Sequence, residues 1–173
     1  MENILKEINY KYSLDIQKEN LKNINLNDKF FNSLKLLYKD FDRWFLKKQK
    51  NGEEAYITKN KKGELTSFLL LKEENEDENY NDFDILFLKI KRLKICTFKV
   101  SERGKNISKA FFEIILKEAK KRNLNEIYIT IFEEVDDLVK ILKREGFKFC
   151  TYKNIITNDG KIKKESVYVK NFK

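Results

Sequence analysis

Apolar and polar residues alternate with two different periods in the N-terminal third of the chain. Between residues 8 and 16 every second position is apolar, which is the period of a half-buried strand. We therefore expect an N-terminal strand and its connection within residues 1–27. Over residues 28–50 the apolar positions recur at helical spacing, which predicts one or two helices. Asn51-Gly52 is expected to end them.

The pattern then changes to a hairpin followed by a charged loop. Residues 53–60 and 64–72 flank Lys61-Lys62-Gly63, a spacing typical of a β-hairpin. Residues 73–84 (EENEDENYNDFD) are acidic and poor in apolar side chains, which predicts an exposed loop. They lack the alternating Asp/Asn-Gly pattern of a calcium loop, so a solvated loop is favoured over a metal site. Residues 85–100 are rich in strand formers and predict one strand or two in succession.

The C-terminal half predicts a long amphipathic helix, a buried strand, a second amphipathic helix and a closing hairpin. Gly146 follows the second helix, where glycine is the usual capping residue. The turn of the hairpin is expected at Asn158-Asp159-Gly160. In order, the four elements are predicted over residues 106–123, 126–132, 135–145 and 147–172.

Composition narrows the class of protein. A chain of 173 residues without an internal repeat or linker is expected to form one domain over residues 1–173. It has no histidine, and Cys96 and Cys150 are not a metal-spaced pair, which excludes a Cys/His zinc site, a Ser-His-Asp triad and a Cys-His dyad. The absence of a signal-peptide core and of long apolar runs predicts a cytoplasmic protein without a membrane span. The formal net charge of +9 is suited to attract nucleic acid, an acidic protein or a polyphosphate cofactor.

A short basic turn between a predicted strand and a predicted helix is the most informative motif. At the start of a helix the backbone N–H groups lack intrahelical acceptors and the helix dipole is positive, which suits an anion such as a pyrophosphate. Gly104 allows the backbone to approach a ligand closely, and Arg103 and Lys105 add positive charge. An ordinary turn with surface lysines is the alternative that the motif leaves open. The motif reads Arg103-Gly104-Lys105-Asn106-Ile107-Ser108.

The turn and its surroundings resemble the acetyl-CoA-binding core of the GCN5-related N-acetyltransferases (GNATs). The family fingerprint is Arg/Gln-x-x-Gly-x-Gly/Ala after a strand that ends in Val. Val100 matches the end of that strand, Arg103 the first position and Ile107 the apolar spacer. The later Gly-Phe of the family matches Gly146-Phe147. Residues 93–147 are thereby similar to the acetyl-CoA-binding core, and the resemblance covers most of the chain from about residue 28.

This resemblance implies an α/β fold with a mixed central sheet flanked by helices, in which two central strands at residues 93–100 and 126–132 splay apart. GNATs transfer an acyl group from a thioester to an amine, with a base that removes the amine proton and backbone N–H groups that hold the oxyanion. The resemblance implies acetyl-CoA as the cofactor and implies no metal. The residues it assigns to the cofactor are Phe98, Lys99, Val100, Arg103, Gly104, Lys105, Asn106, Ile107 and Ser108.

Three departures from the family pattern bear on activity. Asn106 and Ser108 replace fingerprint glycines, although Asn tolerates a left-handed backbone well and a Ser hydroxyl can donate to a phosphate. Only Ser101-Glu102 separates the strand from Arg103, a shorter link than is usual. Many members have a general-acid Tyr four residues before the Gly of Gly-Phe, and this chain has Leu142 there.

Several residues have a catalytic and a structural interpretation. Glu133 is the candidate base, with Glu134 beside it, but two acidic residues that open a helix are favoured as the explanation. Cys96 is either an acyl acceptor or, more simply, a small buried side chain. Tyr128 and Tyr152 are either phenolic acids or packing residues.

Two function classes follow. The first is N-acetyl transfer to an amine of a macromolecule, either a protein or an aminoacyl-tRNA, with weak tRNA binding suggested by the basic excess. The second is a catalytically silent GNAT-like module that binds CoA or nucleic acid, suggested by Leu142 and by the altered glycines. Turnover separates the two classes, whereas the acceptor, the acyl chain length and the oligomeric state have no signal in the sequence.

Overall fold

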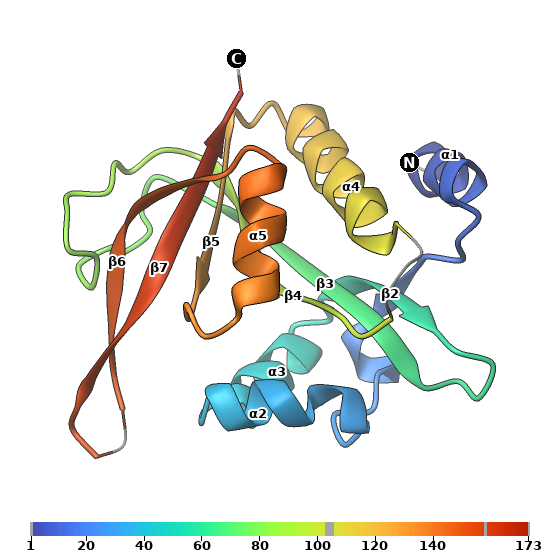
Figure 1. Ribbon diagram of the computed structural model, residues 1–173, viewed down its shortest axis with the longest axis horizontal. Helices are drawn as coiled ribbons and strands as arrows, with labels where there is room; N and C mark the ends of the chain where they lie inside the picture. The colour runs from blue at the N-terminus through green and yellow to red at the C-terminus, as the bar shows by residue number, and fades with distance from the viewer. Residues whose placement is uncertain (1, 103–105, 158, 173) are drawn as a thin grey trace. The chain divides into compact units, whose positions relative to one another are not determined.

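A computed structural model describes residues 2–102, 106–157 and 159–172 of the chain (Figure 1). Its strands form a mixed seven-stranded sheet in the hydrogen-bonded order β1-β2-β3-β4-β5-β7-β6, accompanied by five α-helices in the described ranges. The predicted α/β class is confirmed. Contacts group the chain into a first unit, Met1–Leu70 with Thr97–Ile114, and a second unit, Leu71–Cys96 with Ile115–Lys173.

The N-terminal segment of the first unit is a helix. The strand predicted between residues 8 and 16 is wrong, because α1 covers Glu2–Tyr12 and the first strand, β1, covers Gln17–Asn20. Spacing of four residues places Ile4, Ile8 and Tyr12 on one helix face, and Ile8 is fully buried. Tyr10, which completed the apparent alternation, is 90% exposed on the outer face.

Aromatic packing stabilises the helical part of the first unit. The helices predicted over residues 28–50 form as a 3₁₀ turn, Lys29–Phe31, followed by α2, Asn32–Leu37, and α3, Phe41–Lys50. Phe31 is fully buried at their centre. Its ring lies 5.2 to 5.6 Å, between centroids, from the rings of Phe30, Phe41, Phe45 and Phe68.

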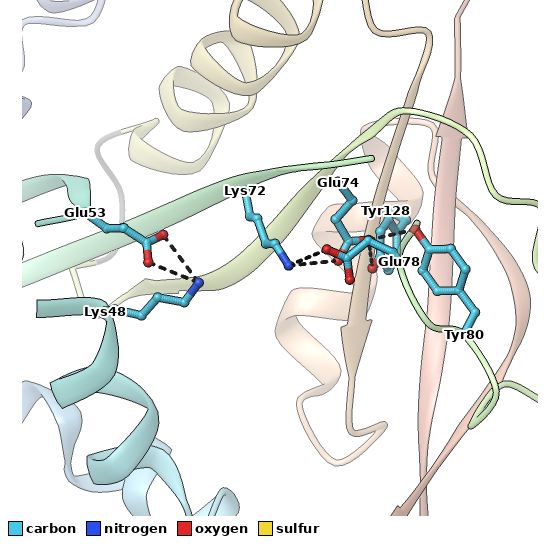
Figure 2. Close-up of polar contacts among 7 residues, drawn as sticks. All are labelled: Lys48, Glu53, Lys72, Glu74, Glu78, Tyr80 and Tyr128. Carbon is cyan, nitrogen blue, oxygen red and sulfur yellow. Dashed lines mark hydrogen bonds and ion pairs between the residues drawn. The ribbon is translucent and has the colours of Figure 1, made fainter. Parts of the chain in front are cut away.

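The predicted hairpin is present as β2, Glu54–Lys59, and β3, Leu65–Glu74. Gly63 in its turn has φ +78°, a conformation that glycine adopts without strain. The antiparallel partner of β2 on its other side is β1. At the end of α3, Lys48 forms an ion pair with Glu53 at 3.2 Å, which joins that helix to the start of the hairpin (Figure 2).

The second unit contains the parallel part of the sheet. Strand β4, Arg92–Val100, pairs in parallel with β5, Glu126–Ile131, from Leu93–Ile127 to Ile95–Ile129. β4 continues past this pairing to Val100, and β5 continues to Ile131. The remaining elements are α4, Ile107–Lys121, which has residues in both units, α5, Asp136–Arg144, and the closing antiparallel pair β6, Lys148–Ile156, and β7, Ile162–Asn171.

The connection between β3 and β4 is more ordered than the acidic loop that the sequence predicts. Three of its rings, Tyr80, Phe83 and Phe87, contact one another and pack on Tyr128 of β5. The backbone of Phe83 also forms an isolated antiparallel β-bridge with Lys153 of β6. Strand structure does not begin at residue 85, as the sequence suggested, but at residue 92, because the preceding residues follow these aromatic contacts.

In the described ranges, the helices are too short or too polar for any of them to cross a lipid bilayer.

The aromatic cluster of the first unit leads to a test of stability. Phe31→Ala should lower the free energy of unfolding by about 3–5 kcal/mol, because it removes a buried ring that four others contact. Urea unfolding followed by circular dichroism measures the change. Leu36→Ala, which alters an 86% exposed side chain on α2, is the matched control and should have little effect. Equal losses in both variants would contradict the packing described.

Candidate functional site

Helix α4 begins at Ile107, within the motif of residues 103–108. Asn106 precedes the helix with φ +55°, and its carbonyl oxygen accepts a hydrogen bond from Ala110 N at 3.1 Å. Asn106 thus adopts the left-handed conformation that it was expected to tolerate in place of a fingerprint glycine. Ile107 is buried and Ser108 is half-buried. The other predicted members of the turn, residues 103–105, lie outside the described residues.

The end of β4 packs against the start of α4 within the first unit. The Phe98 ring lies 5.7 Å from that of Phe111 and 5.4 Å from that of Phe112, and Phe98 is only 8% exposed. Two predicted cofactor stretches, residues 98–100 and 106–108, are therefore carried by two elements in direct contact. Ser101 extends this arrangement, since its N–H and its hydroxyl both donate to the Thr66 carbonyl, at 2.9 and 3.0 Å.

The side chain of Lys99 has structural partners. Its Nζ donates to the Phe30 carbonyl oxygen and to Ser33 Oγ, the latter at 2.8 Å, and lies 4.5 Å from the centroid of the Phe30 ring. Burial lowers the pKa of Lys99. The side chain thus fastens β4 to the start of α2, which leaves the Lys99 backbone as the part that the resemblance assigns to the cofactor.

The candidate base Glu133 lies just after β5 in the second unit. Its side chain is exposed, and Glu133 Oε1 accepts a hydrogen bond from Ser166 Oγ of β7 at 2.8 Å. Glu134 is also exposed and pairs with Lys163 at 3.4 Å. A hydrogen bond from its own backbone N–H, assisted by Lys163, lowers the pKa of Glu134. Both groups are accessible, and Glu133 is the one oriented by a neutral hydroxyl.

A buried carboxylate that the sequence analysis missed lies at the end of β3 (Figure 2). Glu74 is 3% exposed, and its Oε1 accepts hydrogen bonds from Tyr80 OH at 2.9 Å and from Tyr128 OH. Lys72 Nζ lies 3.8 Å from Glu74 Oε2 and 2.7 Å from Glu78. The signal in the sequence was the group of aromatic residues that interrupts and follows the acidic run, since solvated loops rarely contain them.

Burial keeps both phenols protonated to a higher pH than an exposed tyrosine. It raises the pKa of Tyr80 to about 12 and also raises the pKa of Tyr128. Each hydroxyl therefore remains a hydrogen-bond donor to the carboxylate. Tyr128 is only 1% exposed and is committed to Glu74, which favours its structural interpretation over that of a phenolic acid.

Arg92 completes this interior at the start of β4. It is 1% exposed, its Nε donates to Glu126 at 2.6 Å, and its Nη1 donates to the Leu88 carbonyl at 2.7 Å. The guanidinium also lies 4.0 Å from the centroid of the Phe87 ring, in cation–π contact. Arg92 therefore fixes the C-terminal end of the β3–β4 connection.

Other candidates have structural roles or remain open. Leu142, at the family's Tyr position, is fully buried. Cys96 is half-buried, and neither it nor the exposed Cys150 is in a disulfide. Lys120 and Lys121, which contribute to the basic excess of the chain, are exposed at the end of α4. Within the described residues, the structure contains no group of three or more His, Cys, Asp or Glu side chains placed to hold a metal ion.

Comparison with solved structures identifies the fold. The chain is similar to NAA60 from Arabidopsis thaliana in complex with a bisubstrate analogue, with 16% identity, a TM-score of 0.60 and coverage of 91% of this chain and 98% of that one. It is similar to a ribosomal-protein-alanine N-acetyltransferase from Brucella melitensis, with 12% identity, a TM-score of 0.62 and coverage of 92% and 100%. It is also similar to an IAA acetyltransferase from Bacillus cereus, with 16% identity, a TM-score of 0.59 and coverage of 92% of this chain and 99% of that one. No protein-family model and no curated protein matches the sequence.

The raised tyrosine pKa predicts a loss of stability in alkali. A phenol whose pKa is higher in the folded than in the unfolded state contributes stability below pH 10, and this contribution is lost as the pH rises towards 12. The free energy of unfolding should therefore fall more steeply above pH 10 in the wild type than in Tyr80→Phe. Urea unfolding over this pH range measures the two slopes. Tyr10→Phe, at a 90% exposed tyrosine, is the control, and a Tyr80→Phe slope equal to that of the wild type would contradict the assignment.

Proposed function

We propose that this chain, which has the fold of the GCN5-related N-acetyltransferases, is an acetyl-CoA-dependent N-acetyltransferase that acts on an amine of a macromolecule. The observation that carries the proposal is the left-handed Asn106 at the start of α4, in a chain that matches acetyltransferase structures over more than nine-tenths of its length. A fold alone does not establish an activity. The turn supplies the specific feature, since it provides the helix start where a phosphate is bound.

The cofactor-binding role is assigned to the first unit. Acetyl-CoA supplies an acetyl group activated as a thioester. The first-turn N–H groups of α4, with Arg103 and Lys105, would bind its phosphates, and the backbone of residues 98–100 would bind its pantetheine arm. The packing of Phe98 on Phe111 and Phe112 supports this assignment, because it holds the strand and the helix in one fixed relation. Residues 1–173 would act as one GNAT-like domain.

The proton of the acceptor amine needs a base, and Glu133 is the proposed one. Because the chain has no histidine and no Tyr at position 142, the base would be a carboxylate, a water held by one or the solvent itself. Glu133 is exposed at the end of β5, and the Ser166 hydroxyl orients it without neutralising its charge. No phenolic acid is required, because a CoA thiolate is a much better leaving group than an amine. The acceptor would be a protein amine or an aminoacyl-tRNA.

A catalytically silent module that binds CoA is the second candidate. Leu142 favours the silent module, because a leucine at the family's Tyr position offers no hydroxyl to protonate a leaving group. Leu142 is also fully buried. A silent module would bind acetyl-CoA but would transfer nothing to any cellular protein or RNA.

Cofactor binding is tested through the turn. Acetyl-CoA at millimolar concentration should raise the melting temperature, because a ligand that binds only the folded state stabilises it by mass action. Gly104→Asp should abolish the shift by placing a carboxylate against the phosphates. Asn106→Gly should keep the shift, whereas Asn106→Val should lose it, because a β-branched residue is strained at φ +55°. The absence of a shift in the wild type with acetyl-CoA or CoA would overturn the proposal.

Catalysis is tested at the end of β5. Glu133→Gln should lower kcat by about 100-fold or more and barely change the affinity for acetyl-CoA. Glu134→Gln is the matched control, since that carboxylate is paired with Lys163 and should contribute little. The rate of the wild type should climb with pH until the acceptor amine is neutral. Full activity of Glu133→Gln on the true acceptor would refute the choice of base, and binding without any transfer would favour the silent module.

A further inference from the structure

The connection between β3 and β4 exposes an unusual number of aliphatic side chains. Ile85, Leu86, Leu88 and Ile90 are 50%, 91%, 66% and 40% exposed, within six consecutive residues. Scattered exposed aliphatic residues are common in soluble proteins, but a contiguous group marks a surface that another molecule covers. We call residues 82–91 the loop strip.

The loop strip is held in place at both ends within the second unit. At one end, Asp84 N donates to the Tyr152 carbonyl at 2.9 Å and Asn154 N donates to the Asp82 carbonyl at 2.8 Å. At the other end, Phe87 is buried among the aromatic rings, and Arg92 bonds the Leu88 carbonyl. The exposed aliphatic side chains are thus presented by a fixed backbone. A preorganised surface loses little conformational entropy when it binds.

Charge along the loop strip changes sign from one end to the other. Asp82 and Asp84 lie at its beginning, Lys89 and Lys91 lie at its end, all four are exposed, and the aliphatic side chains lie between. Asp84 is partly neutralised by Lys164 at 2.8 Å, which leaves Asp82 as the less neutralised acid. A surface with an acidic end, an apolar middle and a basic end is complementary to itself after a two-fold rotation.

The charge of the rest of the chain points to the same occupant. Copies with a net charge of +9 repel one another except where acidic residues are concentrated. Seven of the 28 acidic residues lie within residues 73–84, which contain no Lys or Arg and lead directly into the aliphatic residues. The exposed acids of this run, Glu76, Asp77 and Asp82, repel an anionic membrane or a nucleic acid, so neither is favoured as the partner.

We propose that the loop strip is a dimerisation surface, on which a second copy of this chain docks about a two-fold axis. The aliphatic side chains of the two copies pack together, and the acidic end of each strip faces the basic end of the other. This inference is independent of the proposed acetyl transfer, because its readout is the oligomeric state.

Sedimentation equilibrium over roughly a hundredfold range of protein concentration tests the dimer, since association follows mass action. The wild type should show a monomer–dimer equilibrium that weakens in high salt. Leu86→Asp and Leu88→Asp should each raise the dissociation constant at least about tenfold, because each places a charge in the apolar centre. Leu36→Asp, at a comparably exposed leucine of the first unit, is the control and should leave the equilibrium unchanged.

A charge exchange tests the two-fold arrangement itself. Asp82→Lys alone and Lys91→Asp alone should each weaken the dimer, since each brings like charges together. The double variant should recover wild-type association, because the acidic and basic ends have exchanged places. A monomer at every concentration, a dimer indifferent to Leu86→Asp, or additive losses in the double variant would each overturn the proposal, as would association of the monomer with anionic vesicles through the same leucines.

Discussion

Burial of the Glu74 carboxylate is the constraint on which the second unit depends. A carboxylate removed from water costs several kcal/mol unless donors replace its hydration, and here two phenols and a nearby ammonium do so. One phenol comes from β5 and the other from the β3–β4 connection. The hydrogen bonds that the Glu74 carboxylate needs therefore hold the β3–β4 connection against the sheet. Once Tyr80 is fixed, the contacts of Phe83 and Phe87 follow, and the aliphatic residues next to them face outward.

The parts of the fold that the sequence predicts correctly are those whose signal is local. The hairpin at Gly63, the helix from Asn106 and the closing hairpin each combine a periodic pattern with a turn residue of the required conformation. The predicted N-terminal strand was wrong because Ile8 and Tyr12 fit both a strand period and a helical spacing of four, and only the tertiary burial of Ile8 decides between them. The buried network at Glu74 was missed because one of its two phenols, Tyr128, is 54 positions away in the sequence.

In the candidate site too, the features with a local signal were predicted, and those that depend on tertiary contacts were not. The position of the turn and the tolerance of Asn106 for a left-handed backbone were evident from residue types. The engagement of Lys99 with Phe30 and Ser33 was not, because it depends on how the segment between β1 and α2 folds back onto β4. Glu133 is exposed, so an acceptor amine can approach it. Its role as base stays a prediction, because the fold is shared by enzymes with different acceptors.

The left-handed turn at Asn106 has a consequence for protein engineering. Ser13, Asn106 and Asn123 all take φ near +55°, a left-handed conformation that glycine adopts without strain, that asparagine tolerates and that strains serine by about 1–2 kcal/mol. The chain has five glycines in 173 residues, and it places serine and asparagine at left-handed positions where glycine is the usual residue. At Ser13, which lies outside the candidate site, replacement by glycine would relieve this strain without altering the proposed chemistry, and the greater freedom of the unfolded chain would offset part of the gain.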